Sequence, residues 1–229
     1  MGARLWAFTQ MGLARRAMGK LPGAGFWKLL GSGTGEGFTP IPNTAVYGIM
    51  ATWPDIATAR AQTRDAPVFD RYRAKAAENW TVFLSTTSAR GEWDGRAPFN
   101  VAQPPQDGAV AALTRATIKP RILMKFWKRV PNISAAIGAD PNVAFKIGLG
   151  EVPWLHQVTF SIWPDTASMA NFARKDGPHA RAIKAVREGE WFAEELYARF
   201  HVVEARGSWN GADPLQHIAA QDLRGARPA

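Results

Sequence analysis

The chain has 229 residues, 46% hydrophobic and 11% aromatic, enough for one sizeable core or two fused half-domains. It has no cysteine, which excludes disulfides, zinc–thiolate sites, iron–sulfur clusters and thiolate-bound haem. Its formal net charge is +9. No apolar run reaches the roughly 18 to 20 residues that span a bilayer, and the N-terminus lacks a signal-peptide pattern, so we expect a cytoplasmic protein.

Hydrophobic periodicity predicts the elements of the first half in chain order. They are a helix over residues 3–18, strands over 26–31 and 44–53, a helix over 55–79 and a strand over 81–93.

The second half repeats this succession and adds a strand in front. We predict a strand over 110–118, a helix over 121–137 and strands over 143–149 and 154–163. A further helix is capped by Asp165 or Thr166, is broken at Gly177 and restarts at Pro178 to end near Tyr197. A strand over 198–209 follows.

The two halves resemble each other in sequence. Residues 53–55 recur as 163–165 (Trp-Pro-Asp), 89–95 recur as 205–211 (Ala-Arg-Gly-x-Trp-x-Gly), and Trp80 matches Trp191. The offsets predict eight extra residues within 31–42 of the first copy and five between Trp191 and Trp209 of the second. A duplication explains both matches and gaps.

The order strand, helix, strand, strand, helix, strand is that of a ferredoxin-like unit. We therefore predict an α+β fold of tandem ferredoxin-like repeats, forming a pseudo-dimeric α+β barrel in which the first strand of repeat one is missing. Residues 1–98 form the first repeat, 99–108 a linker, 109–212 the second repeat and 213–229 a polar tail. The equivalent of 110–118 would precede Met1, so we expect a full-length form to begin with an alternating apolar segment, the alternative being an exposed sheet edge.

A glycine-rich stretch, GSGTGEGFTPIP, covers residues 31–42. It matches no phosphate-binding loop, because Phe38 replaces the third glycine and no Lys follows. Glycines at 33, 35 and 37 are typical of a pocket wall whose backbone approaches a ligand, or of a long flexible hairpin.

The four histidines are His156, His179, His201 and His217. They form no HExxH or HxxxH pair, so a two-histidine facial triad would need partners distant in sequence. The pattern is compatible with a single-histidine metal site such as haem with one proximal imidazole. His179 lies on one helical stripe with Ile183, and is either a buried ligand or a first-turn histidine with a satisfied hydrogen bond. His156 lies at alternate positions of a predicted strand with Trp154, Val158 and Phe160, so its side chain is able to face a pocket.

No nucleophile is set up by spacing, which disfavours hydrolases. Glu194 and Glu195 are interpreted as a solvated helix face. The positive charge is spread without a nucleic-acid-binding motif, so we expect no nucleic-acid partner. It favours an anionic membrane surface or a solvated surface without a partner, and the supporting cations are Arg15, Arg16, Lys20, Lys119, Arg121, Lys125, Lys128 and Arg129.

Four segments carry a resemblance to a known family. They are residues 10–16 (QMGLARR), 31–43 (GSGTGEGFTPIPN), 157–164 (QVTFSIWP) and 190–200 (EWFAEELYARF). Over nearly its whole length the chain resembles the spheroidene monooxygenases, also called acyclic carotenoid 2-ketolases, of purple phototrophic bacteria. That family typically begins with an extra short strand.

The resemblance implies a haem-dependent monooxygenase of carotenoid biosynthesis, converting spheroidene to spheroidenone at the 2-position with dioxygen and reduced ferredoxin at the photosynthetic membrane. Without cysteine, histidine ligation of iron is expected, by His179 or secondarily by His156. Haem propionates are assigned to Lys28, Arg90 or Arg206, and a substrate pocket to Gly33, Gly35, Gly37, Phe38, Trp154 and Phe160. The alternative is a non-catalytic haem or carotenoid carrier.

Overall fold

The protein is described by a computed structural model. It covers residues 2–35, 37, 39–102, 104, 107–128, 140–174 and 189–218.

The first repeat begins with two helices and three strands follow. Its elements are α1 (Ala3–Leu13), α2 (Arg15–Met18), β1 (Trp27–Gly33), β2 (Pro42–Ala51), α3 (Ile56–Asp65), α4 (Pro67–Arg73) and β3 (Trp80–Gly91). Asp55 caps α3 by accepting a 2.7 Å hydrogen bond from the Thr58 amide. The single predicted helix over 55–79 is wrong, because Ala66 precedes Pro67 and takes an extended conformation that separates α3 from α4.

The second repeat contains the full succession of four strands. Its elements are β4 (Val110–Ile118), η1 (Pro120–Ile122), α5 (Leu123–Trp127), β5 (Phe145–Gly150), β6 (His156–Trp163), α7 (Thr166–Arg174) and β7 (Phe192–Gly207). The predicted strand over 110–118 is confirmed at both ends. Asp165 is the cap, since its carboxylate accepts from the Ser168 amide at 2.6 Å. The parts of the predicted helices that fall on 129–137 and 175–188 lie outside the described residues.

The helical end near Tyr197 is wrong, because β7 already begins at Phe192. Along residues 192–197 the even-numbered positions are less exposed than their odd-numbered neighbours, and β4 pairs with this segment from Ile118 to Thr114. Pairing with an apolar neighbour strand outweighs the helix propensity of the Glu-Glu-Leu run.

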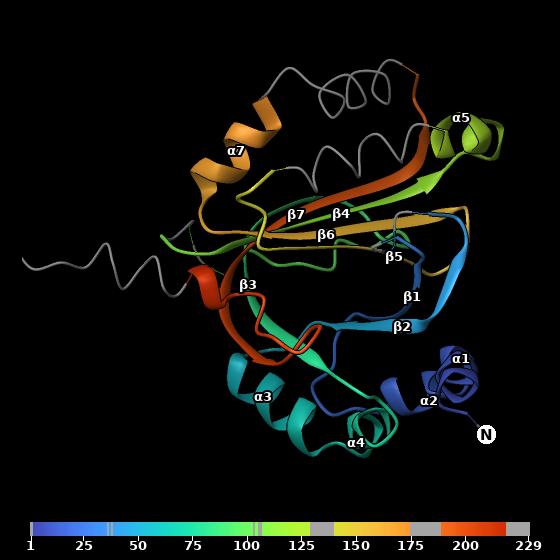
Figure 1. The fold of residues 1–229 in the computed structure, drawn as a ribbon, viewed down its shortest axis with the longest axis vertical. Helices are drawn as coiled ribbons and strands as arrows, with labels where there is room; N and C mark the ends of the chain where they lie inside the picture. The colour runs from blue at the N-terminus through green and yellow to red at the C-terminus, as the bar shows by residue number, and fades with distance from the viewer. Residues whose placement is uncertain are drawn as a thin grey trace, which may run out of the picture.

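The seven described strands form one antiparallel sheet in the order β2-β1-β5-β6-β4-β7-β3. Within it, β7-β4-β6-β5 has the strand order of a complete ferredoxin-like unit, and β1, β2 and β3 are the three strands of the incomplete first unit. The sheet curls, with helices on its outer side (Figure 1). Its two ends, β2 and β3, are the strands that a first strand of repeat one would pair with, so the predicted pseudo-dimeric fold lacking that strand is confirmed.

A pseudo-twofold relation governs how the repeats pair. Trp80 faces Gly207 and Gly91 faces Leu196 at the two ends of the β3–β7 ladder, and a shift by 116 residues exchanges these two pairs. The predicted match of Trp80 with Trp191 is therefore wrong: Trp80 is equivalent to Leu196, and the extra residues of the second copy precede Leu196.

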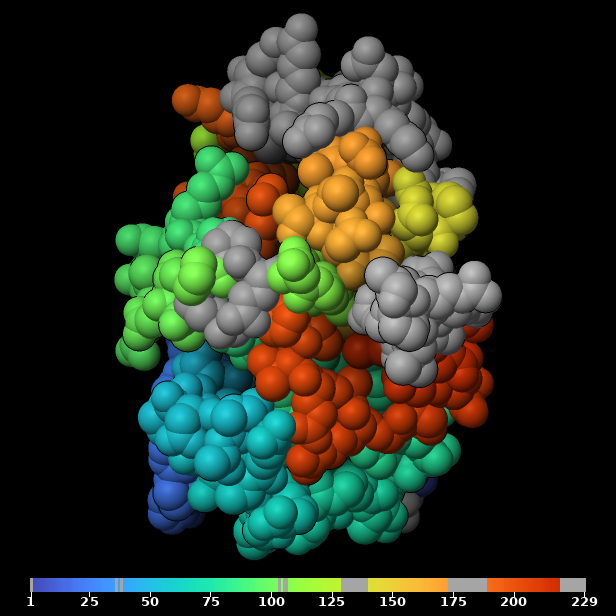
Figure 2. Space-filling view, turned by 90° about the vertical axis from the view of Figure 1, so that its left-hand side faces the viewer, coloured from blue at the N-terminus to red at the C-terminus, as the bar shows by residue number. Residues whose placement is uncertain are grey.

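Apolar residues fill both sides of the sheet. The concave side holds the main core, which joins Leu30, Leu113, Ile147, Ile162 and Leu196 from five strands. Separate clusters on the outer side pack α1, α2 and α4 against β1 and β2, and α5 and α7 against the second repeat. On the face shown in Figure 2, α7 (orange) and α3 (cyan) lie in opposite halves of the molecule, with the segment after β7 (red) between them.

Candidate active site on the concave face of the sheet

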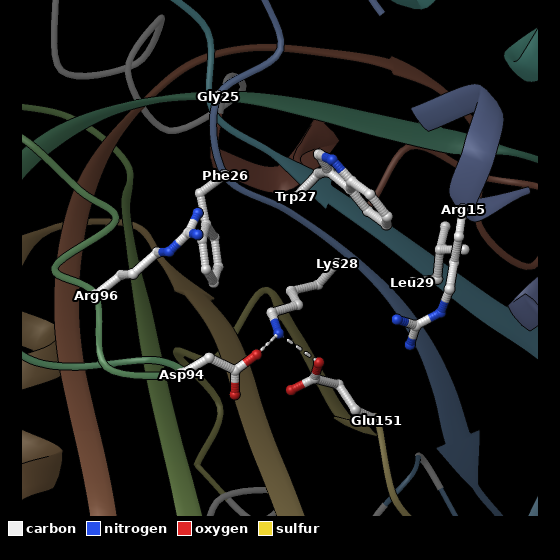
Figure 3. A pocket seen from close by; sticks show the side chains of 9 residues that line it. All are labelled: Arg15, Gly25, Phe26, Trp27, Lys28, Leu29, Asp94, Arg96 and Glu151. Carbon is white, nitrogen blue, oxygen red and sulfur yellow. Dashed lines mark hydrogen bonds and ion pairs between the residues drawn. The ribbon is translucent and has the colours of Figure 1, made fainter. Parts of the chain in front are cut away.

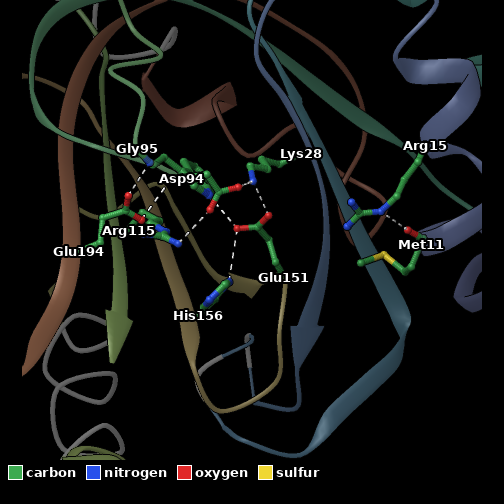
Figure 4. Close-up of polar contacts among 10 residues, drawn as sticks. Met11, Arg15, Lys28, Asp94, Gly95, Arg115, Glu151, His156 and Glu194 are labelled. Atoms are coloured by element: carbon green, nitrogen blue, oxygen red, sulfur yellow. Dashed lines mark hydrogen bonds and ion pairs between the residues drawn. The ribbon is translucent and has the colours of Figure 1, made fainter. Parts of the chain in front are cut away.

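Charged side chains interrupt the apolar core at one end of the concave face. Lys28 shares the alternation of Leu30 on β1, Arg115 that of Leu113 on β4, and Glu194 that of Leu196 on β7. We call the set Lys28, Asp94, Arg115, Glu151, His156 and Glu194 the inner polar cluster (Figure 4).

Glu151, in the second repeat, accepts hydrogen bonds from two residues of the first repeat. Its carboxylate receives hydrogen bonds from Lys28 Nζ and from Trp93 Nε1, both at 2.7 Å. His156 Nδ1 lies 3.6 Å from Oε2 of the same carboxylate. Lys28 also pairs with Asp94, so its ammonium lies between two carboxylates. Because the Lys28 and Glu151 side chains are only 11% and 10% exposed, this pairing is largely shielded from water.

Arg115 is the most deeply buried charge of the cluster, at 1% exposure. It pairs with Glu194, and its Nη2 lies 3.6 Å from Asp94 Oδ1. Glu194 in turn accepts the backbone amides of Asp94, at 3.2 Å, and Gly95, at 2.8 Å. A buried guanidinium with these partners positions the turn after β3 against β4 and β7.

The surroundings within the inner polar cluster lower the pKa values of His156, Asp94 and Glu194. Burial lowers the pKa of His156, the Arg115 charge lowers it further, and Glu151 and Asp94 oppose both. Burial opposes ionisation of Asp94, yet the hydrogen bond and charge of Lys28 outweigh it and lower the pKa of that carboxyl. The pKa of Glu194 is lowered in spite of burial by the two amides and by Arg115. At neutral pH the lowered pKa values thus keep Asp94 and Glu194 ionised and the His156 imidazole neutral.

A cavity of about 320 Å³ opens beside this cluster. Figure 3 shows the Lys28 ammonium between Asp94 and Glu151, with Arg15 and Arg96 at opposite sides. The lining residues are Arg15, Gly25, Phe26, Trp27, Lys28, Leu29, Asp94, Arg96 and Glu151. Among the described residues neither Arg15 nor Arg96 forms an ion pair, so both guanidinium groups remain able to meet an anionic group.

The sequence-predicted cofactor residues are dispersed. Lys28 and His156 lie in the inner polar cluster. Arg90 stacks on the Tyr197 ring at 4.6 Å, and Arg206 pairs with Glu204 while lying 5.3 Å from the Phe83 ring centroid. His179 lies outside the described residues.

The predicted substrate-pocket residues do not meet in one place. A Cβ on Gly33 would lie 2.2 Å from Thr39 O, and one on Gly37 would lie 1.8 Å from Gly148 O, so these glycines let the loop pack on itself and on β5. Trp154 is half exposed and accepts a hydrogen bond from Trp127 through its carbonyl.

Phe160 and Phe38 are the remaining aromatic residues of the predicted pocket. Phe160 packs into the main core against Phe145. Phe38 lies outside the described residues.

The sequence interpretation missed Arg115, Glu151, Asp94 and Glu194. Glu194 is not on a solvated helix face; it lies on β7 and pairs with a buried cation. Arg115 carried a usable signal, since it is the one charged residue within the apolar strand 110–118. A charged residue in a strand with both faces buried needs a partner carboxylate.

Two features are absent from the described residues. In these ranges no helix is long and apolar enough to cross a membrane. No group of three or more His, Asp or Glu side chains there is arranged to hold a metal ion.

The fold and site define a doubled ferredoxin-like α+β protein with a partly buried polar cluster on the concave face of its sheet. Sequence relatives resolve the family. The chain is 50% identical to spheroidene monooxygenase of Cereibacter sphaeroides, covering 99% of this chain and 71% of that protein, and 54% identical to that of Rhodobacter capsulatus, covering 92% and 88%. It is 37% identical to that of Rubrivivax gelatinosus, covering 91% and 80%. The chain belongs to the spheroidene monooxygenase family, and the predicted resemblance and monooxygenase class are confirmed.

Other comparisons add little. No family model matches the chain. A solved protein of Fusobacterium nucleatum has a TM-score of 0.42 at 13% identity, covering 91% of this chain and 90% of that one. An anthrone oxidase-like protein has a TM-score of 0.34 at 11% identity, covering 90% and 87%. These likenesses are too weak to support an argument about function.

Proposed function

We propose that this monooxygenase is haem-dependent and oxidises an acyclic carotenoid, spheroidene to spheroidenone, at the 2-position with dioxygen and reduced ferredoxin. The observation that carries the proposal is the identity of 50% and 54% to two proteins named for spheroidene over nearly the whole chain. Substrate choice within a family at this identity usually follows from a retained site.

The inner polar cluster suits a histidine-ligated haem in two respects. First, an imidazole must be neutral to ligate iron, and burial together with Arg115 lowers the pKa of His156. Second, Nδ1 of His156 faces a carboxylate 3.6 Å away, which is the usual outer partner of a metal-ligating histidine. His156 is therefore a ligand candidate beside His179, the first choice from sequence.

Haem, when bound, would supply the oxygen activation that no side chain of this chain offers. The chain's own residues would then have three tasks. Glu151 would orient His156 and hold the Nδ1 proton. Arg15 and Arg96, at the cavity, are suited to carboxylate groups of the cofactor. The apolar concave face would exclude water from a hydrocarbon substrate.

The reductant and location follow from charge and substrate. A net charge of +9 suits an acidic ferredoxin as the electron donor. A carotenoid dissolves in lipid, so we place the enzyme in the cytoplasm at the surface of the photosynthetic membrane.

The test is reconstitution of the purified protein with haemin. We expect a Soret band, and oxygen-dependent ketone formation from spheroidene in detergent micelles once ferredoxin is reduced. Either His156→Ala or His179→Ala should abolish the wild-type Soret position, identifying the ligand. His217→Ala is the matched control, and should leave the spectrum unchanged.

Each other result has a distinct meaning. A Soret band without ketone formation would favour the carrier function. Ketone formation by protein that holds no haem would refute haem dependence. If both histidine variants kept the wild-type spectrum, the proposed ligation would be wrong.

A further inference from the structure

Helix α1 exposes large apolar side chains, which is unusual for a helix whose outer side faces only water. An amphipathic surface helix normally turns its apolar face to the core. Here Leu5, Phe8 and Leu13 are 55%, 62% and 72% exposed, whereas Gln10 is buried. Since α1 already packs against β1 and β2 through its other face, these three side chains form a second apolar face directed outward.

The charge of the chain segment that carries this face has one sign. Residues 1–35 contain no Asp or Glu and five cations, namely Arg4, Arg15, Arg16, Lys20 and Lys28. Lys28 is buried in the inner polar cluster and the other four side chains are exposed. An apolar helix face bordered by exposed cations and no carboxylate is the pattern of a helix that lies in an anionic membrane interface.

The corresponding helical region of the second repeat has the same character. Met124 on α5 is 68% exposed. The cations between 119 and 128 are Lys119, Arg121, Lys125 and Lys128, again without an acid. Figure 1 shows both helices on the right-hand side of the view, α5 at the top and α1 at the bottom, with β1 and β2 between them.

The position of α1 also relates to the cavity. Arg15, in the first turn of α2 directly after α1, lines the cavity beside Lys28. A lipid-facing α1 therefore brings the cavity close to the bilayer, where a hydrocarbon substrate resides.

From these observations we infer that the outer face of α1, formed by Leu5, Phe8 and Leu13 and bordered by Arg4, Arg16 and Lys20, is the surface by which the enzyme binds anionic membranes. The inference rests on the proposed membrane association and assigns it to a defined face. The occupant is a bilayer surface with anionic headgroups, because the face combines apolar groups with exposed cations in a segment, residues 1–35, that holds no Asp or Glu.

The test is co-sedimentation with vesicles of phosphatidylcholine alone or mixed with phosphatidylglycerol. We expect wild-type protein to partition at least about tenfold more strongly onto the anionic vesicles, given about fivefold for each cation near the surface. The double variant Phe8→Asp/Leu13→Asp should lose at least about tenfold of that partitioning.

The matched control is Val101→Asp/Val203→Asp. It replaces two other exposed apolar residues and changes the net charge equally. It should lower partitioning less than about threefold, because only the general charge effect remains. Thermal unfolding of both variants checks that they fold.

The possible outcomes distinguish an error in the assigned face from an error in the proposed membrane association. If the α1 variant and the control lose partitioning equally, the face is wrong and membrane association stands. If wild-type protein ignores both kinds of vesicle, membrane binding itself is wrong, while ketone formation in micelles still reports on the reaction. If α1 instead mediates a concentration-dependent dimer that the double variant dissolves, a second copy is the occupant and the inference is overturned.

Discussion

Glu78 and Glu194 cap the same turn in the two repeats. Glu194 accepts the backbone amides of Asp94 and Gly95, and Glu78 accepts those of Asn210 and Gly211, at 2.7 Å each. The two glutamates are 116 residues apart, the shift that also relates the ends of the β3–β7 ladder. They differ in one respect, because Glu194 alone also pairs with a buried arginine.

Replacing these glutamates should therefore have unequal effects. Glu194→Gln should lower the free energy of unfolding by roughly 2 kcal/mol, since it leaves Arg115 buried with weaker compensation. Glu78→Gln, on an exposed turn, should cost clearly less. Denaturant unfolding of both variants measures the difference, and equal losses would contradict the role given to Arg115.

The pKa of His156 should respond to its neighbours with opposite signs. Glu151→Gln should lower it further, because the carboxylate charge favours the imidazolium. Lys28→Gln should raise it, because the ammonium disfavours that charge. Titration of the imidazole by NMR measures both shifts, and shifts of the same sign would show that Glu151 and Lys28 do not act on His156 by charge.

Stability should fall on mild acidification. The folded-state pKa of His156 lies below 6.5, so above that pH the imidazole is neutral in both states and contributes nothing. As pH falls below 6.5 the unfolded chain binds the proton first, and the free energy of unfolding decreases until the folded pKa is passed. His156→Asn should lack this decrease. Urea unfolding between pH 7 and pH 5 tests it, and an identical pH dependence in the variant would argue against a depressed pKa.

The lowered pKa values of Asp94 and Glu194 affect the free energy of unfolding at more acidic pH. Their stabilisation is complete above the unfolded-state values near 4 and is lost as pH falls through the lower folded values. The loss below pH 4 should be smaller in Asp94→Asn than in wild type. An unchanged slope in that window would show that Lys28 does not hold Asp94 ionised.

The loop after β1 offers a backbone test. Gly37→Ala would place a Cβ 1.8 Å from Gly148 O at a φ of +89°, so the loop must move and stability should drop by about 2 kcal/mol or more. Gly35→Ala is the control, since its nearest neighbour is 3.6 Å away and its φ of +58° is only mildly unfavourable. Comparable losses in the two variants would mean that contact with β5 does not explain Gly37.

Sequence periodicity was sufficient for the doubled fold, because both repeats carry the same alternation of strands and helices. It failed at residues 192–197, where pairing with β4 overrides the helical preference of Glu194 and Glu195. It also misjudged the site. Glu151 lies in a turn and Asp94 in another, and only tertiary pairing across the repeats brings their carboxylates to Lys28.

Haem-dependent oxygen insertion is tested most directly by isotope labelling. Haem-loaded protein is incubated with spheroidene, reduced ferredoxin and ¹⁸O₂, the ketone is reduced immediately with hydride to prevent oxygen exchange with water, and the label in the product is measured by mass spectrometry. We predict that the product oxygen derives from dioxygen, and that the same protein without haem forms no product. Equal turnover without haem, or product oxygen derived from water, would contradict it.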